Sequence, residues 1–464
     1  MINLNPEMFR AYDIRGIVDR DLSPEIMEVI GKAFGTFLLN KGTKDVVVGR
    51  DSRATSEEYQ KSLTRGILST GCNVFDVGLT LSSGVYFARQ HFKIDGAAYV
   101  TASHNPPQYN GLKLCSGLKS ISDKEIQIVK DIAISGEFKS GQGEEKKLDS
   151  NSIYFEEIRK RVNHKKKLKI VIDAGNATAG PFLPDFLRSM GFDVVPLHCD
   201  LDPTYPNHTP DPVHQEAYKD LIAKIKEEKA DVGLLFDGDG DRLGFVDEKG
   251  NIHLGDIILG LLIRDIIPRN PGRKVIVELK DSEMVVDETK RLGGIPIIWK
   301  TGHSFLDPKV HEENAILCAE MSCHYWIVDN WFIFDDAVHT AARVLQIISN
   351  SDKTLSELVD DLPKYVRTPE YRVACPEEKK FKFVEEVVEY FKTKCDRYID
   401  VDGIRGYLED GWFLLRASNT QPLLAIRCEA KTQEGLDKIK SMVKEKLDQY
   451  DFVNLDWNRQ YDKE

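Results

Sequence analysis

The sequence predicts an α/β protein of several domains that ends in a smaller α+β domain. Short apolar runs alternate with amphipathic stretches along most of the chain, which is the pattern of repeated α/β units. The 464 residues exceed what one hydrophobic core supports, so about three or four domains with a cleft between them are expected. The segment 369–464 has a different order of predicted helices and strands from the rest of the chain, which indicates a separate domain.

Six short runs rich in Val, Ile, Leu and aromatic residues predict buried strands of sheets that are covered on both faces. The first helix is expected to begin at Pro24, with Ser23 as its N-cap, because apolar residues then recur at spacings of three and four. The predicted strands are Asp45–Gly49, Gly96–Val100, Leu168–Asp173, Asp231–Phe236, Lys274–Leu279 and Ile295–Trp299.

The clearest domain boundary is the polar, glycine-rich stretch Ser135–Ser150, and weaker signals lie near 255 and 368. The predicted α/β domains are therefore 1–150, 151–255 and 256–368, followed by the α+β domain 369–464. In this last domain we expect a helix over Glu377–Lys394, strands around Trp412–Arg416 and Leu423–Cys428, and a terminal amphipathic helix.

Composition excludes several classes of function. Hydrophobic residues make up 41% and charged residues 30% of the chain, which is not the composition of a disordered protein. The net charge of −12 repels nucleic acid and anionic membranes, so neither is an expected partner, and a phosphate ligand would need a local basic cluster. The N-terminus carries no signal-peptide pattern, and the eight cysteines form no C-x-x-C pair, so a cytoplasmic location is predicted. No oligomeric state is predicted.

Ser103 is the first candidate functional residue. It follows the apolar run Gly96–Val100, its neighbours His104 and Asn105 can donate hydrogen bonds, and two prolines stiffen the next turn. A serine in such a place can also simply close a strand. A serine hydrolase is disfavoured because no G-x-S-x-G elbow surrounds it.

A metal site is predicted at Asp237, Asp239 and Asp241, which alternate with glycines directly after a predicted strand. Three carboxylates can converge on one hard cation, and they leave room for a phosphoryl oxygen, which favours Mg²⁺ over Ca²⁺. An EF-hand is the rival reading. It fails because Arg242 stands where that loop requires glycine.

Two further loops carry groups that suit a phosphosugar. Arg416–Pro422 joins a guanidinium, two hydroxyls and an amide after a strand, which suits a dianionic phosphate, although a turn closing a hairpin is the alternative. Glu320 and Ser322 offer a carboxylate and a hydroxyl for vicinal sugar hydroxyls. A zinc site built from Cys318, Cys323, His303 and His324 is disfavoured because the spacing matches no usual pattern.

Taken in order, these motifs resemble the α-D-phosphohexomutase superfamily, most closely its phosphomannomutase/phosphoglucomutase group. That resemblance implies three related mixed α/β domains and a mobile smaller fourth domain around a deep central cleft. The motifs that carry it are Phe9–Gly16, Gly49–Arg53, Thr101–Pro106, Asp237–Arg242, Lys300–His303, Glu320–His324 and Arg416–Thr420.

The resemblance also implies roles for individual residues. Ser103 would be a phosphoserine whose phosphate, with Asp237, Asp239 and Asp241, holds Mg²⁺. Arg15, Lys113 and His324 would line the reaction centre, with Lys113 or His324 as the general base. The implied substrate-binding residues are Arg242, Lys280, His303, Glu320, Ser322, His324, Arg416, Ser418, Asn419 and Thr420.

The implied activity is the interconversion of hexose 1-phosphate and hexose 6-phosphate, of mannose or glucose or both, through a hexose 1,6-bisphosphate. Alternatives are a phosphoglucosamine mutase or phosphopentomutase, a non-catalytic phosphosugar-binding protein and a metal-dependent phosphatase. Ala319 and Cys323 replace two glycines that are usual in the sugar loop of the family. If either position has positive φ, its replacement is expected to cost about 1–2 kcal/mol or to change the loop.

Overall fold

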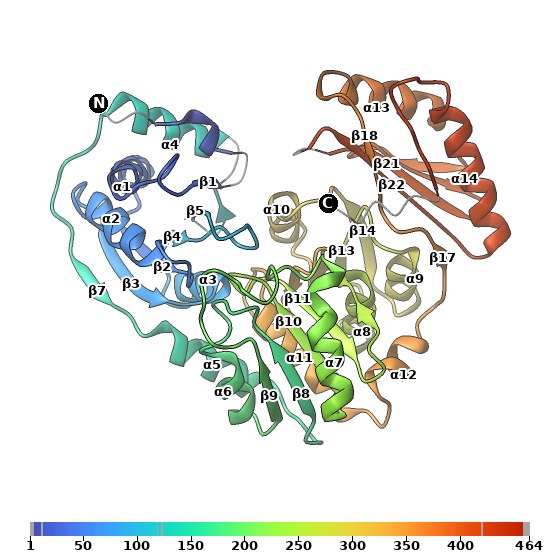
Figure 1. Cartoon of the computed structure of the whole chain (residues 1–464), viewed down its shortest axis with the longest axis horizontal. Helices are drawn as coiled ribbons and strands as arrows, with labels where there is room; N and C mark the ends of the chain where they lie inside the picture. The colour runs from blue at the N-terminus through green and yellow to red at the C-terminus, as the bar shows by residue number, and fades with distance from the viewer. Residues whose placement is uncertain (1–3, 11–12, 118, 122–123, 419–420, 458–464) are drawn as a thin grey trace. The chain divides into compact units, whose positions relative to one another are not determined.

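The computed structural model describes residues 4–10, 13–117, 119–121, 124–418 and 421–457, which fall into two compact units (Figure 1). Unit 1 contains the chain up to Ile258 together with Ser322–Leu358, and unit 2 contains Leu259–Met321 and the chain from Val359 onward. The predicted α/β fold with a C-terminal α+β domain is confirmed. Among the described residues, no helix has both the length and the apolar character to cross a membrane.

The first sheet of unit 1 has the strand order β1-β5-β4-β2-β3-β7, with β6 paired to β5. β2, β3, β4 and β7 run parallel, whereas β5 is antiparallel to both β4 and β1. The sheet is therefore mixed. Its strands are β1 (Ile14–Ile17), β2 (Asp45–Arg50), β3 (Asn73–Leu79), β4 (Gly96–Val100), β5 (Tyr109–Ser116), β6 (Lys119–Ser120) and β7 (Glu145–Lys147).

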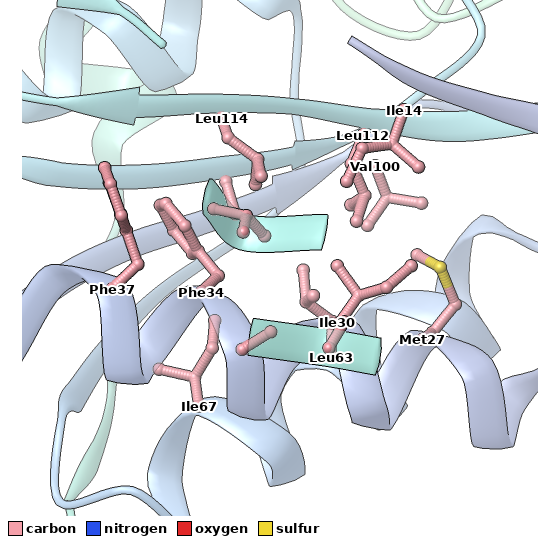
Figure 2. Packing of buried hydrophobic residues seen from close by; sticks show 14 of the residues in the cluster. Ile14, Met27, Ile30, Phe34, Phe37, Leu63, Ile67, Val100, Leu112 and Leu114 are labelled. Atoms are coloured by element: carbon pink, nitrogen blue, oxygen red, sulfur yellow. The ribbon is translucent and has the colours of Figure 1, made fainter. Parts of the chain in front are cut away.

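Helices α1 (Pro24–Asn40), α2 (Ser56–Leu68) and α4 (Lys124–Ser135) form the helical side of this core, and α3 (Ser82–His91) also packs against the sheet. Ser23 caps α1 by accepting a hydrogen bond from the Ile26 amide, as predicted. The helices α1 and α2 approach closely because glycine stands at their contact: a β-carbon at Gly66 would lie 2.1 Å from the Glu28 carbonyl oxygen. Figure 2 shows the apolar side chains of α1 and α2 facing those of β1, β4 and β5.

The second sheet of unit 1 has the order β12-β11-β10-β8-β9. β8 is parallel to both β9 and β10, and β11 turns back antiparallel to β10. Its strands are β8 (Lys169–Asp173), β9 (Asp193–Leu197), β10 (Val232–Phe236), β11 (Leu243–Asp247) and β12 (Ile252–His253), and the neighbouring helices are α5 (Ser150–Arg161), α6 (Leu183–Ser189) and α7 (Lys219–Glu228).

Residues 322–358 complete unit 1 with β16 (Tyr325–Ile327) and α11 (Ala337–Asn350). The Cys323 carbonyl accepts from the Leu243 amide, and the Tyr154 hydroxyl donates to Asp336 at 2.6 Å. These contacts join a late part of the chain to α5 and β11.

Unit 2 holds the parallel strands β13 (Lys274–Glu278), β14 (Ile295–Trp299) and β15 (Leu317–Ala319), with β13 in the middle. The helices beside them are α9 (Glu283–Arg291) and α10 (His303–Glu313). Two helices, α8 (Gly255–Ile266) and α12 (Leu355–Asp360), lie where the chain passes from unit 1 to unit 2.

The C-terminal part of unit 2 is an antiparallel sheet of order β17-β22-β21-β20-β19, with β18 also paired to β22. Helices α13 (Glu377–Lys392) and α14 (Gln433–Leu447) pack on it, and together they bury an apolar core (Figure 1). The strands are β17 (Val366–Arg367), β18 (Tyr371–Ala374), β19 (Arg397–Ile399), β20 (Ile404–Leu408), β21 (Gly411–Ala417) and β22 (Leu423–Ala430).

One segment differs from its expected form. The polar stretch Ser135–Ser150 contains β7, which pairs parallel to β3 although its Glu-Lys-Lys side chains are all exposed. The pairing is made by backbone hydrogen bonds, so the side-chain pattern of this segment does not predict a strand. The stretch extends the first sheet as well as leading to α5.

The backbone at Cys323 is in the left-handed region, with φ of +73°, whereas Ala319 is not among the residues with positive φ. Of the two glycine replacements noted in the sequence, only Cys323 therefore carries the expected strain. The side chain is fully buried, and burial raises the pKa of its thiol to about 12.

Cys323→Gly is predicted to be more stable than Cys323→Ala by about 0.5–1 kcal/mol, because both variants lose the thiol but only glycine relieves the positive φ. Equilibrium unfolding in urea measures the difference. Ala319→Gly is the matched control and is expected to be destabilising. A Cys323→Ala variant that equals or exceeds Cys323→Gly in stability would contradict the assignment of strain.

Candidate functional site

Ser103 lies in the loop that joins β4 to β5, and its side chain is held from several directions. Its φ is +50°, a conformation that costs a non-glycine residue about 1 kcal/mol or more. The Ser103 amide donates to Thr101 Oγ1 at 2.8 Å, and its hydroxyl donates to Asp237 Oδ2 at 2.9 Å. His104 Nδ1 lies 3.1 Å from the same hydroxyl. The strained backbone thus directs this hydroxyl at the aspartate loop.

The Arg53 side chain fixes the backbone of the Ser103 loop. Its buried guanidinium donates to four backbone carbonyls of the loop, those of Ser103, Asn105, Pro106 and Tyr109, at 2.6–3.0 Å. Asp51 lies 3.3 Å from Arg53 Nε and balances its charge. A planar fork with five donors suits such a set of carbonyls, and a lysine would satisfy fewer of them. The fixed loop geometry therefore depends on a residue 50 positions away in sequence.

The second part of the site is the loop after β10, which carries Asp237, Asp239 and Asp241. Their carboxylates are buried, and one oxygen from each lies within 4.8 Å of the others. Asp237 Oδ1 accepts from the amides of Asp241 and Arg242, which folds the loop around the carboxylate. Gly238 is required here because a β-carbon would lie 2.2 Å from the Ser103 carbonyl oxygen.

Lys113, on β5, pairs with two of these carboxylates: Nζ lies 2.7 Å from Asp239 and 2.5 Å from Asp241. Burial lowers the pKa of this ammonium group, but the two carboxylates outweigh burial and raise it well above the ordinary value. Burial and the neighbouring Asp241 and Asp239 raise the pKa of Asp237 well above its usual range. The loop therefore holds more buried negative charge than one lysine neutralises.

Within the described residues, Asp239 Oδ1 and Asp241 Oδ1 are buried with no hydrogen-bond partner. A buried carboxylate oxygen without a donor is costly, and a hard divalent cation removes that cost. All the atoms that could coordinate an ion here are carboxylate oxygens, which Mg²⁺ prefers as ligands. The residues present therefore fit such an ion.

Arg242 follows the aspartate loop and contacts His324 and Asp211 within unit 1. Its Nε donates to His324 Nε2 at 3.0 Å, and its guanidinium lies 3.4 Å from Asp211. His324 Nδ1 lies 2.9 Å from Asp335, which orients the imidazole. Because Arg242 donates to it, Nε2 of His324 is an acceptor nitrogen in this arrangement.

Arg15 lies on β1, with its guanidinium donating to the Asn105 side chain at 2.7 Å and paired with Asp13 at 2.6 Å. It therefore contacts the Ser103 loop. Ser322 also belongs to unit 1, and among the described residues its buried hydroxyl has no hydrogen-bond partner.

The other predicted residues belong to unit 2. Lys280 Nζ, just after β13, lies 3.3 Å from Glu278 and 3.4 Å from Glu370. Burial opposes the charge of Lys280, but these carboxylates and Glu320 raise its pKa above the ordinary value. Burial raises the pKa of Glu278 to about 7, although the positive charge of Lys280 acts to lower it. Glu278 also accepts from the Met321 amide at 2.7 Å, which fixes the turn after Glu320.

Arg416 is the penultimate residue of β21, and its Nε donates to Asp402 at 2.9 Å. Ser418 Oγ accepts from the Gln421 amide at 3.2 Å, so this hydroxyl closes the turn between β21 and β22. His303 is the first residue of α10. The predicted residues Asn419 and Thr420 lie outside the described residues.

Several residues with clear geometric roles carried no predicted role. Arg53 was within a recognised motif, and its position after the strand containing Val48 was the available signal. Asp211 and Asp335 orient Arg242 and His324, and Glu278 and Glu370 flank Lys280. These contacts are distant in sequence, so local pattern does not reveal them.

Comparison with known proteins gives a consistent result along the chain. Family models described as phosphoglucomutase/phosphomannomutase match at residues 6–139 (alpha/beta/alpha domain I), 152–250 (alpha/beta/alpha domain II), 254–365 (alpha/beta/alpha domain III) and 370–446 (C-terminal domain). The "Phosphomannomutase/phosphoglucomutase" of Pseudomonas aeruginosa is 38% identical over 444 residues, which is 96% of each chain.

A "Phosphoglucomutase" of Neisseria meningitidis serogroup A is 37% identical over 451 residues, covering 96% of this chain and 97% of that protein. A crystal structure of a phosphoglucomutase/phosphomannomutase family protein from Burkholderia thailandensis superposes with a TM-score of 0.90 at 34% identity, covering 96% of this chain and 98% of the other. Because all four family domains match in order and the relatives are similar over nearly their full length, this chain belongs to the phosphoglucomutase/phosphomannomutase family.

Proposed function

We propose that this protein interconverts hexose 1-phosphate and hexose 6-phosphate, of mannose, glucose or both, with Ser103 as the phosphate carrier. The observation that carries the proposal is the 2.9 Å hydrogen bond between the Ser103 hydroxyl and Asp237, within a buried group of three carboxylates. Similarity to named phosphomannomutase/phosphoglucomutase enzymes supports the same reaction class.

The proposed reaction is balanced without net hydrolysis. Phosphorylated Ser103 gives its phosphate to a sugar hydroxyl: the serine O–P bond breaks, the sugar O–P bond forms, and a base takes the hydroxyl proton. The resulting hexose 1,6-bisphosphate turns over, and its other phosphate returns to Ser103. Of the two candidate bases in unit 1, His324 presents an acceptor nitrogen, whereas Lys113 is an ammonium between two carboxylates and would have to lose a proton before it could accept one.

We propose that Asp237, Asp239, Asp241 and the phosphate on Ser103 hold Mg²⁺, which would neutralise charge on the transferred phosphoryl group. The buried Oδ1 atoms of Asp239 and Asp241, which accept no hydrogen bond from the described residues, support this assignment. We propose that Arg15, which contacts Asn105 in the Ser103 loop, and Arg242, whose charge acts on Asp237, supply positive charge to the site.

We assign the substrate's sugar hydroxyls to Glu320 and Ser322, and its other phosphate to Arg416, Ser418, Asn419 and Thr420. Lys280, His303, Arg242 and His324 are proposed to contact substrate as well. The support in unit 2 is the buried, charged character of the residues around Lys280 and Arg416.

We further propose four domains over 1–150, 151–255, 256–368 and 369–464, and a cytoplasmic location with a phosphosugar as the partner molecule. The eight cysteines are all free thiols, which supports a reducing compartment.

Ser103→Ala is predicted to lower mutase turnover by at least about 10⁴-fold, because the phosphate acceptor is removed. The measurement is turnover of mannose, glucose, glucosamine and ribose 1-phosphates with Mg²⁺ and a trace of the matching bisphosphate. Ser135→Ala, an exposed serine at the end of α4, is the control. Wild-type-like turnover in Ser103→Ala would refute the carrier, and a preference for the glucosamine or ribose substrate would refute the proposed sugar.

Asp239→Asn is predicted to weaken Mg²⁺ binding and to lower turnover by about 100-fold or more, because one charge at the proposed ion is lost. Isothermal titration with Mg²⁺ and a kcat measurement at saturating Mg²⁺ test it. Asp231→Asn, at an exposed aspartate just before β10, is the control. Unchanged Mg²⁺ affinity in Asp239→Asn would exclude this residue as a ligand.

Arg416→Ala is predicted to raise KM for hexose 1-phosphate by about 10–100-fold, since a charge-assisted contact to phosphate is worth about 1.5–3 kcal/mol. Its melting temperature should change little. Arg397→Ala, which removes a more exposed guanidinium from the same unit, should leave KM unchanged. An Arg416→Ala enzyme with normal KM would remove Arg416 from the proposed phosphate site.

A further inference from the structure

A second group of metal-ligating side chains lies in unit 1, apart from Ser103 and the three aspartates. Asp173 ends β8, His198 follows β9, and His208 lies in the segment that leads toward α7. One ligand atom from each lies within 4.8 Å of the others. Asp173 is fully buried, and the imidazoles are mostly buried. None of the three has a part in the proposed phosphoryl transfer.

Both imidazoles direct one nitrogen at the Asp173 carboxylate. His198 Nδ1 lies 3.3 Å from Asp173 Oδ2, and His208 Nε2 lies 3.1 Å from each Asp173 oxygen. The amide of Gly175 donates to Asp173 Oδ1 at 2.9 Å and fixes the rotation of the carboxylate. Three potential ligands from three separate segments therefore converge on one point.

Each ring also has an acceptor group near its other nitrogen. His208 Nδ1 lies 3.0 Å from the Thr209 carbonyl, an acceptor, so this nitrogen carries the proton. His198 Nε2 lies 3.6 Å from Asp220. A metal-ligating histidine typically directs its other nitrogen at a carbonyl or a carboxylate in this way, which fixes the tautomer and the ring. His208 thus has the outer hydrogen-bond partner of a ligand, and His198 has a carboxylate near the corresponding nitrogen.

The donor set indicates the class of cation. Two imidazole nitrogens and one carboxylate oxygen suit Zn²⁺, whereas Mg²⁺ and Ca²⁺ prefer oxygen ligands alone. With bonds of about 2.0–2.1 Å, the edge of a tetrahedral zinc site is about 3.3–3.4 Å. The nitrogen–oxygen distances of 3.1–3.3 Å need little adjustment to meet that edge.

We propose that Asp173, His198 and His208 bind one Zn²⁺-class cation, with a fourth position left to solvent. On binding, the nitrogens facing Asp173 must be free of protons, so protons are released to the medium and affinity falls as the pH is lowered. The competing account of the same distances is an imidazolium–carboxylate hydrogen-bond pair with no cation.

The site would have a structural role for the neighbouring segment. Three residues after His208, Asp211 pairs with Arg242 at 3.4 Å. Pro210, between them, packs beside Gly175, where a β-carbon would lie 2.7 Å from the Pro210 side chain. A cation on His208 and Asp173 would therefore anchor the segment that positions Asp211.

The experiment is a titration of the chelator-treated full-length protein with Co²⁺, used as a spectroscopic probe for Zn²⁺. Excess Mg²⁺ is present, and Asp239→Asn serves as a second background, so that the aspartate loop does not contribute. We expect one equivalent of Co²⁺ with the visible absorption of a tetrahedral site, displaced by one equivalent of Zn²⁺. A folded parent protein that binds no Co²⁺ would overturn the proposal in favour of the hydrogen-bond pair.

His208→Asn and His198→Asn are expected to weaken Co²⁺ binding by about 100-fold or more. The matched control is His214→Asn, a more exposed histidine of the same segment whose side chain is 51% accessible, and it should bind as the parent does. Circular dichroism checks the fold of each variant. If His208→Asn does not fold, His198→Gln takes its place. Binding that survives loss of these histidines, or that depends on His214, would also overturn the proposal.

Discussion

Buried negative charge is the constraint on which unit 1 depends. Three carboxylates lie at the end of β10 with almost no access to solvent, and leaving them there uncompensated would cost several kcal/mol. Part of that charge is compensated by an ion pair with Lys113. Hydrogen bonds from the amides of Asp241 and Arg242 and from the Ser103 hydroxyl compensate a further part. Among the described residues, Oδ1 of Asp239 and Oδ1 of Asp241 accept no hydrogen bond, and the proposed cation would compensate the charge on these atoms.

The Ser103 loop and the aspartate loop lie in close contact. The Ser103 carbonyl oxygen receives Arg53 and lies against Gly238, which has no side chain to separate the two loops. The amide of Ser82, at the start of α3, donates to the Asp239 carbonyl. The close approach at Gly238 and the Ser103–Asp237 hydrogen bond thus join the two loops, while Arg53 and Ser82 each hold one of them.

Much of this could be predicted from the sequence, and the reason differs between elements. Gly96–Val100 and Ile295–Trp299 were predicted to the residue because an apolar run bounded by polar residues is a local signal. Ser103 and the three aspartates were predicted as site residues from their places after such runs and from the family motifs, and the structure brings them together. The local sequence of β7 has no apolar pattern, so it does not predict a strand. Arg53 donates to carbonyls that are about fifty residues away, so the residues around it do not reveal its role. At Cys323, sequence identified the unusual residue, but only the backbone angle shows that it is the strained one.

The chain passes between the two units near residues 258, 321 and 358, and this path limits how the protein can be divided. A fragment that ends at 258 would lack β16 and α11, and with them the partners of Leu243 and Tyr154. Neither unit is therefore one continuous piece of chain. No single cut in the chain therefore yields two fragments that each carry one whole unit and nothing else.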